Sequence, residues 1–115
     1  MPITILNKQL NNLVLRGEML QVVNLFFADT VSTKDHTGIN LNSKSDHLKK
    51  MDFFTQDIVH VNAITLHNVA INGNISFNEF TFDLEMKFGN KVYWHEIIKR
   101  VWQDGKVLEE QYFIS

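Results

Sequence analysis

The C-terminal half of the chain alternates apolar and polar residues in long runs, and this pattern constrains the fold more than any other feature. Four such runs are present, covering 58–71, 75–88, 92–103 and 106–114. They are separated by dipeptides typical of hairpin turns, namely Asn72-Gly73, Gly89-Asn90 and Asp104-Gly105. Each run is longer than the usual strand of about five to six residues. Consecutive long strands joined by tight turns predict an antiparallel meander.

Two of these runs change phase partway along. The apolar positions shift between Ala63 and Ile64 in the first run, and between Phe77 and Phe80 in the second. A slip in a period-two pattern marks a β-bulge, and bulges within long strands bend a sheet. The sequence therefore predicts a strongly curved antiparallel sheet with a bulge in each of these two strands.

The part of the chain before the meander is predicted to contain three helices. Apolar residues recur at helical spacing over the first thirty residues, and Gly17 interrupts them, which favours two helices in a hairpin. A third helix is expected over 45–54, after a capping-box-like signal at Ser43. The fold class is α+β, a single domain over 1–115 with the three helices packed into the concave side of the sheet.

A short strand is expected between the second and third helices. Val31, Thr33 and Asp35 alternate with polar residues there, so they point to one side of the strand. If Val31 is buried, the side chain of Asp35 also points toward the core. A carboxylate in an apolar surrounding has its pKa raised by desolvation and becomes a usable base near neutral pH. A solvated acid at the end of a strand is the alternative.

Composition excludes several classes of function. The chain has 115 residues, a formal net charge of −2 and no cysteine. No cluster of Lys and Arg exceeds two adjacent residues, so neither a nucleic acid nor an anionic membrane is an expected partner. The absence of cysteine excludes disulfides and thiolate chemistry. With no apolar run of about 18 residues, no signal-peptide pattern and no metal-ligand motif, we expect a cytoplasmic protein without a metal or cofactor.

Two segments carry a resemblance to a known family. The segment "RGEMLQVVNLFFADTV" (16–31) resembles the Gly-acid helix start and F-A-D-D-x-V helix end of SnoaL-like proteins. The segment "VWQDGKVLEEQYF" (101–113) is similar to their W-x-D-G-K-I-x-E-x-x-F hairpin. Together with the order of elements, they resemble the SnoaL-like, nuclear transport factor 2-like superfamily, which includes ketosteroid isomerase, over nearly the whole chain. The resemblance implies a cone-shaped fold whose pocket binds a small hydrophobic molecule, and a homodimer formed through the outer sheet face.

The resemblance also implies a catalytic base. In ketosteroid isomerase the base is an acid a few residues after the F-A-D-D helix end, and Asp35 occupies that position here. The tyrosine and the protonated acid that complete the oxyanion hole of that enzyme correspond to positions at or near Leu10 and Ile98. Neither side chain can donate a hydrogen bond. Steroid isomerisation by that mechanism is therefore not expected.

The run 92–103 supplies the other candidate site residues. If Ile98 faces the pocket, Glu96 and Arg100 face it too, about 7 Å apart, where they could form an ion pair or hold a polar ligand. His95 then faces the dimer side, although it is kept as a second candidate catalytic residue. The predicted ligand-binding residues are Trp94, Glu96, Ile98, Arg100, Leu10 and Phe54.

Two functions are consistent with these observations. The first is binding of a small hydrophobic molecule, with proton-transfer catalysis of the isomerase, cyclase or dehydratase type and Asp35 as base. In that case Glu96, Arg100 or His95 would orient the substrate. The second is a non-catalytic ligand-binding or dimerisation module whose pocket is filled.

Overall fold

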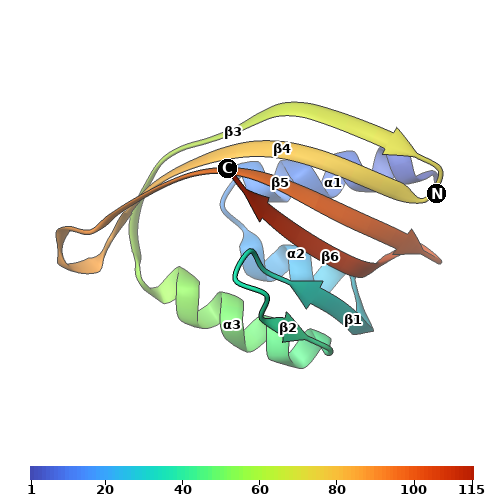
Figure 1. Cartoon of the computed structure of the whole chain (residues 1–115), viewed down its shortest axis with the longest axis horizontal. Helices are drawn as coiled ribbons and strands as arrows, with labels where there is room; N and C mark the ends of the chain where they lie inside the picture. Colours follow the sequence, from blue (N-terminus) through green and yellow to red (C-terminus); the bar gives the residue numbers. More distant parts are fainter.

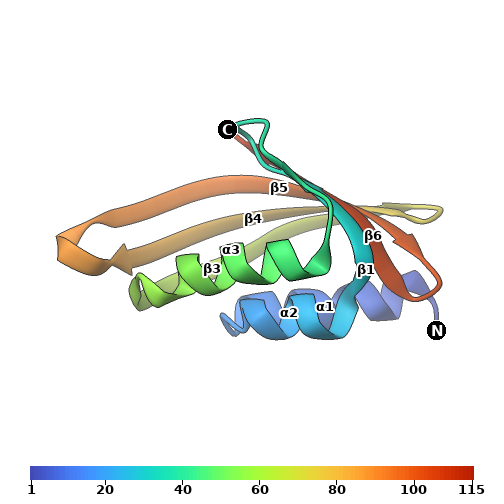
Figure 2. The ribbon, with the colours of Figure 1, turned by 90° about the horizontal axis from the view of Figure 1, so that it is seen from below.

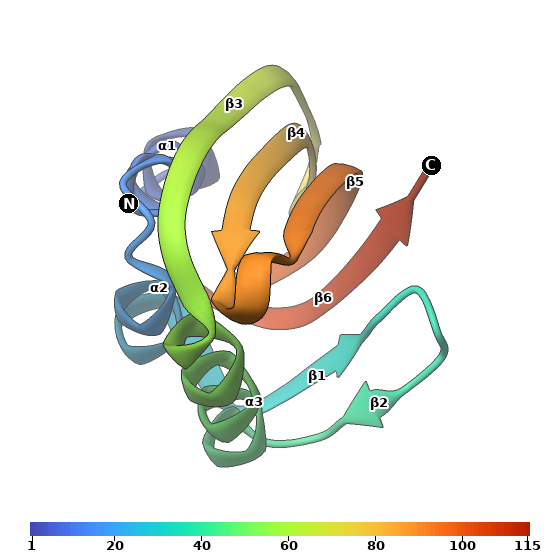
Figure 3. The ribbon, with the colours of Figure 1, turned by 90° about the vertical axis from the view of Figure 1, so that its left-hand side faces the viewer.

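Three helices pack on one face of a curved six-stranded sheet in the computed structural model, which describes residues 1–115 (Figure 1). The helices are α1 (Ile3–Leu15), α2 (Met19–Phe26) and α3 (Lys44–Gln56). The strands are β1 (Phe27–Lys34), β2 (Asn40–Leu41), β3 (Ile58–Asn72), β4 (Ile75–Met86), β5 (Lys91–Gln103) and β6 (Lys106–Ile114), with a short 3-10 helix, η1 (Lys87–Gly89), between β4 and β5. The predicted α+β fold is confirmed, because the three helices lie together on one side of the strongly bent sheet (Figures 2 and 3).

The sheet order is β2-β1-β6-β5-β4-β3. Strands β3 to β6 form the predicted antiparallel meander. Strand β1 then pairs with β6 in parallel, which makes the sheet mixed, and β2 adds a short antiparallel edge. Strand β6 therefore lies between β5 and β1 and connects the meander to the N-terminal part of the chain.

The two turns that set the site geometry follow from local chemistry. Helix α1 ends where Gly17, at φ +74°, donates its N–H to the Val14 carbonyl and Glu18 donates to the Leu13 carbonyl, both at 2.9 Å. This is a Schellman ending, and it confirms the predicted helix hairpin. The Asp104-Gly105 turn has positive φ at both residues, as a type I′ hairpin requires.

The bulges lie in only one of the two strands predicted to have them. Strand β3 shifts register against β4 in three places. By contrast, β4 pairs with β5 without interruption from Ile75 to Glu85, so the bulge predicted in β4 is wrong. The apparent slip has another cause: Ser76 and Asn78 are polar but fully buried on the inner face, while Phe77 is exposed on the outer face.

A polar network centred on Arg100 explains why Asn78 is buried. Arg100 Nε donates to Glu110 Oε2 at 2.9 Å, and Arg100 Nη1 donates to the side-chain oxygens of Asn7 (3.0 Å) and Asn11 (2.8 Å). Asn7 and Asn11 each donate from Nδ2 to Asn78 Oδ1 at 2.9 Å. All five residues are buried. The network therefore fixes α1 against β4, β5 and β6 in one orientation.

We predict that Glu110→Ala destabilises the protein by about 3–5 kcal/mol, because it leaves Arg100 buried without its anionic partner. Urea unfolding at neutral pH measures the difference. The neighbouring Glu109→Gln, an exposed position on the same strand, should change stability by less than about 0.5 kcal/mol. A loss below about 1 kcal/mol for Glu110→Ala would show that the ion pair is not structurally important.

Candidate functional site

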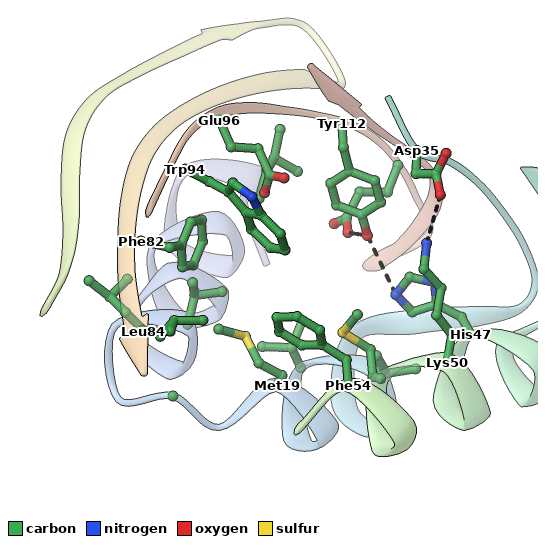
Figure 4. A pocket seen from close by; sticks show the side chains of 18 of the residues that line it. Met19, Asp35, His47, Lys50, Phe54, Phe82, Leu84, Trp94, Glu96 and Tyr112 are labelled. Carbon is green, nitrogen blue, oxygen red and sulfur yellow. Dashed lines mark hydrogen bonds and ion pairs between the residues drawn. The ribbon is translucent and has the colours of Figure 1, made fainter. Parts of the chain in front are cut away.

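A cavity of about 220 Å³ lies between the helices and the inner face of the sheet (Figure 4). Its walls are mainly apolar, and they include Met19 and Phe54 from the helices and Phe82, Leu84 and Trp94 from the sheet. An engineered cavity of about 150 Å³ holds benzene. The cavity therefore has room for a molecule of about one ring with a few substituents.

Most of the predicted ligand-binding residues line this cavity. Trp94, Glu96, Ile98 and Arg100 all point inward from β5, so the even-numbered face of this strand forms the wall. Phe54 faces them from α3, and its ring stacks on that of Trp94 with a centroid distance of 5.6 Å. The alternation of strand residues predicted that the four side chains of β5 share one face, and the structure shows that this face lines the cavity.

Two of the predicted site residues lie outside the cavity. Leu10 is completely buried in the core beneath the cavity and does not line it. His95 lies on the outer face of the sheet, where its Nε2 is 2.7 Å from Glu79 Oε2. Leu10 is therefore a core residue, which corrects its prediction as a ligand-binding residue. His95 has the opposite parity to Glu96 and lies on the outer face that this parity predicts, away from the cavity.

Asp35 lines the cavity, but its carboxylate is already occupied. Oδ1 accepts hydrogen bonds from the Thr37 N–H (2.9 Å), the Thr37 hydroxyl (2.6 Å) and the Ile39 N–H (3.0 Å), and Oδ2 lies 3.4 Å from Lys50 Nζ. Burial alone would raise the pKa of Asp35, but these hydrogen bonds and the Lys50 charge together lower it to about 2. Such a stabilised carboxylate is a weak base near neutral pH.

Glu96 has the opposite environment. Its carboxyl lies in the cavity, and its pKa is raised to about 7. Burial is the largest cause of this shift, and the nearby negative charge of Glu110 is the second. The positive charges of Lys50 and Arg100 oppose this shift without cancelling it. Near neutral pH, Glu96 is therefore close to half ionised and can accept or release a proton.

A chain of hydrogen bonds forms the polar end of the cavity. The Tyr112 hydroxyl donates to Glu110 Oε1, so its oxygen accepts from His47 Nε2 at 3.4 Å, and His47 Nδ1 accepts from the Thr33 hydroxyl at 3.1 Å. Burial lowers the pKa of His47 and keeps the ring neutral. Burial and the Glu110 charge raise the pKa of Tyr112. Sequence reasoning had not assigned roles to Glu110 and Tyr112, although the Asp104-Gly105 turn brings their strand beside β5.

No three acidic or histidine side chains are grouped in a way that could hold a metal ion. None of the helices is both long enough and apolar enough to cross a membrane.

Comparison with known proteins identifies the fold. Neither a family model nor a curated protein matches the sequence. Among solved structures, a SnoaL-like polyketide cyclase from Mesorhizobium loti superposes with a TM-score of 0.86 at 20% identity, covering 98% of this chain and 99% of that one. An LEH-like epoxide hydrolase from M. tuberculosis superposes with a TM-score of 0.72 at 12% identity, covering 88% of this chain and 74% of that one. A protein with a ketosteroid isomerase-like fold from Catenulispora acidiphila, in complex with trimethylamine, superposes with a TM-score of 0.72 at 13% identity, covering 84% of this chain and 75% of that one.

The chain therefore has the cone-shaped fold that SnoaL-like, nuclear transport factor 2-like and ketosteroid isomerase-like proteins share. This fold holds both ligand-binding and catalytic proteins, so the function has to be argued from the cavity.

We predict that Glu96→Gln stabilises the protein at pH 8 but not at pH 4. The folded-state pKa of Glu96, about 7, exceeds its ordinary value of 4.5, so wild-type stability falls as the pH rises from 4.5 to 7. The uncharged variant avoids this loss and should gain about 1–3 kcal/mol at pH 8. Urea unfolding at both pH values measures the gain. A midpoint near 4.5 for Glu96 in a carbon-13 NMR titration would contradict the prediction.

Proposed function

We propose that this protein binds a small, largely apolar molecule in the cone cavity and transfers a proton to or from it, with Glu96 as the acid–base group. One observation carries the proposal: a carboxyl with a pKa of about 7 lies within an apolar cavity that is large enough for a ligand. General acid–base catalysis is most effective when the pKa of the group lies near the working pH.

Glu96 is better suited to this role than Asp35, the base expected from sequence. Asp35 has four polar contacts and a pKa of about 2, so a proton delivered to it would displace stabilising hydrogen bonds. By contrast, no hydrogen bond contributes to the pKa of Glu96, which burial and neighbouring charges determine. We propose that Asp35 orders the loop after β1 and holds Lys50 at the cavity.

The structural neighbours support a small-molecule function at the coarse level. They include a polyketide cyclase, an epoxide hydrolase and a trimethylamine complex. Each concerns a small molecule, but at 12–20% identity none indicates the ligand of this chain. Non-catalytic ligand binding is the alternative function. A filled pocket is not favoured, since the cavity is open in the structure.

Solvent exchange tests the assignment of Glu96. One-ring ketones and cyclic iminium ions deuterated beside the C=O or C=N group are incubated with the protein, and loss of deuterium is followed by NMR. The exchange rate should rise with pH along a titration curve whose midpoint lies near pH 7. Glu96→Gln should lower the rate by about 100-fold or more.

Two further variants give this experiment its controls. Glu109→Gln makes the same charge change on an exposed position of the neighbouring strand and should leave the rate unchanged. If Asp35→Asn abolishes exchange while Glu96→Gln remains active, Asp35 is the base after all. If no compound exchanges faster with the protein than without it, the non-catalytic alternative is favoured.

We also propose that the protein forms a homodimer through the outer face of the sheet. Three large apolar side chains are exposed there on β4, β5 and β6, namely Phe77 (41%), Ile97 (37%) and Phe113 (46%). Ile97 and Phe113 are directly paired across β5 and β6. An apolar patch on a broad sheet surface is typical of a protein interface.

Ile97→Glu should convert the dimer to a monomer, because it places a charge at the centre of this patch. Light scattering after gel filtration at micromolar concentration measures the mass. Ile5→Glu is the matched control, since Ile5 is similarly exposed (46%) but lies on α1. A monomeric mass for the wild type would refute the dimer.

A further inference from the structure

We propose that the ligand of the cavity is a small organic monocation, such as an iminium or a substituted ammonium ion, and that the Glu96 carboxylate is its counter-ion. This inference rests on the proposed function, because it concerns the same cavity and the same carboxyl. It goes further by naming the charge and chemical class of the ligand.

The charges around Glu96 support a cation. The charged and titratable groups that line the cavity with it come from every element around it: Asp35 and His36 after β1, His47 and Lys50 on α3, Arg100 on β5, and Glu110 and Tyr112 on β6. Lys50 is paired with Asp35 at 3.4 Å, and Arg100 with Glu110 at 2.9 Å. Glu96 is thus the one carboxylate of the cavity without a cationic partner. With the histidines neutral, the wall has a formal charge of −1 whenever Glu96 is ionised.

The surrounding side chains suit an organic cation better than a hydrated inorganic one. Trp94 lies two residues from Glu96 on the same inward face of β5, and the rings of Phe54, Phe82 and Tyr112 also line the cavity. The faces of aromatic rings attract cations, and indole does so most strongly. A cation with apolar substituents would contact these rings while its charge is balanced by Glu96.

The available hydrogen-bond donors argue in the same direction. Proton removal from a neutral carbonyl compound would leave an enolate in the cavity, and an enolate needs a donor or a cation. The Tyr112 hydroxyl already donates to Glu110, while Lys50 and Arg100 are engaged by Asp35 and Glu110. These three donors are therefore not free to stabilise the anion.

An iminium ion avoids that difficulty. The proton of the C–H bond beside the C=N⁺ group moves to Glu96, the C–H electron pair forms a C=C bond, and the C=N π pair moves onto nitrogen. The products are a neutral enamine and a neutral carboxylic acid. Because an ion pair becomes two neutral groups, no new charge has to be stabilised in the apolar cavity.

A pair of isosteric probes tests the inference. Choline carries a permanent positive charge, and 3,3-dimethyl-1-butanol has the same shape with carbon in place of nitrogen. Both are titrated by calorimetry at pH 5.5 and pH 8.5. Over this interval the ionised fraction of a group with a pKa of about 7 rises about 30-fold. The affinity for choline should rise by up to that factor, while the affinity for the neutral probe should fall.

Variants separate this inference from the proposed function. Glu96→Gln should abolish the pH dependence and weaken choline binding at pH 8.5 by at least tenfold, yet still bind the neutral probe. Glu109→Gln, with the same change of charge on an exposed position, should behave like the wild type. If the neutral probe binds more tightly than choline at pH 8.5, the ligand is not a cation, but the proposal of small-molecule binding still holds. Absence of binding by either probe would overturn both proposals.

Discussion

The ion pair between Arg100 and Glu110 is the interaction on which the rest of the structure depends. On one side Arg100 reaches Asn7 and Asn11 of α1, and on the other Glu110 accepts the hydroxyl of Tyr112. One buried pair thereby joins the helical layer to the centre of the sheet. A buried charge is tolerated only when its partners are complete. Here every buried polar side-chain atom has a hydrogen-bond partner, so the network permits a single packing of α1 on the sheet.

The same pair contributes to the chemistry of the cavity. Glu110 is held beside the cavity by its 2.9 Å contact with Arg100, and its negative charge contributes, after burial, to the raised pKa of Glu96. Two carboxyl groups of one cavity, Asp35 and Glu96, thus have pKa values of about 2 and about 7 because their surroundings differ, which is a common way to define an acid–base site. A residue that stabilises the fold therefore also influences the pKa of Glu96, the proposed acid–base group.

Local rules were sufficient to predict the three helices, the antiparallel meander and the shared face of the residues on β5, but they did not predict the parallel pairing of β1 with β6. Turn dipeptides located the strands of the meander, and parity placed Trp94, Glu96 and Ile98 on one face. Parity failed where the interior is polar: Ser76 and Asn78 interrupt the apolar pattern without any bulge.

The polar end of the cavity could not be derived in this way. Counting back from the Asp104-Gly105 turn pairs Arg100 with Glu109, but an irregularity next to Val101 shifts the register, so the partner is Glu110. The pKa of Glu96 is likewise a product of neighbours brought from other elements by the fold. The isomerase-like position of Asp35 was visible in the sequence, whereas the hydrogen bonds that lower its pKa depend on the loop conformation.

The central place of β6 in the sheet has a consequence for how the molecule is made. This strand is the most C-terminal one, yet it pairs with β1 in parallel, as Phe27 with Val107, and carries both Glu110 and Tyr112. Pairings between segments so far apart in sequence form late and slowly. A chain emerging from the ribosome therefore has two unsatisfied sheet edges, on β1 and β5, until β6 inserts between them. The polar end of the cavity forms only at that step, and the interval before it is when the chain is most exposed to aggregation.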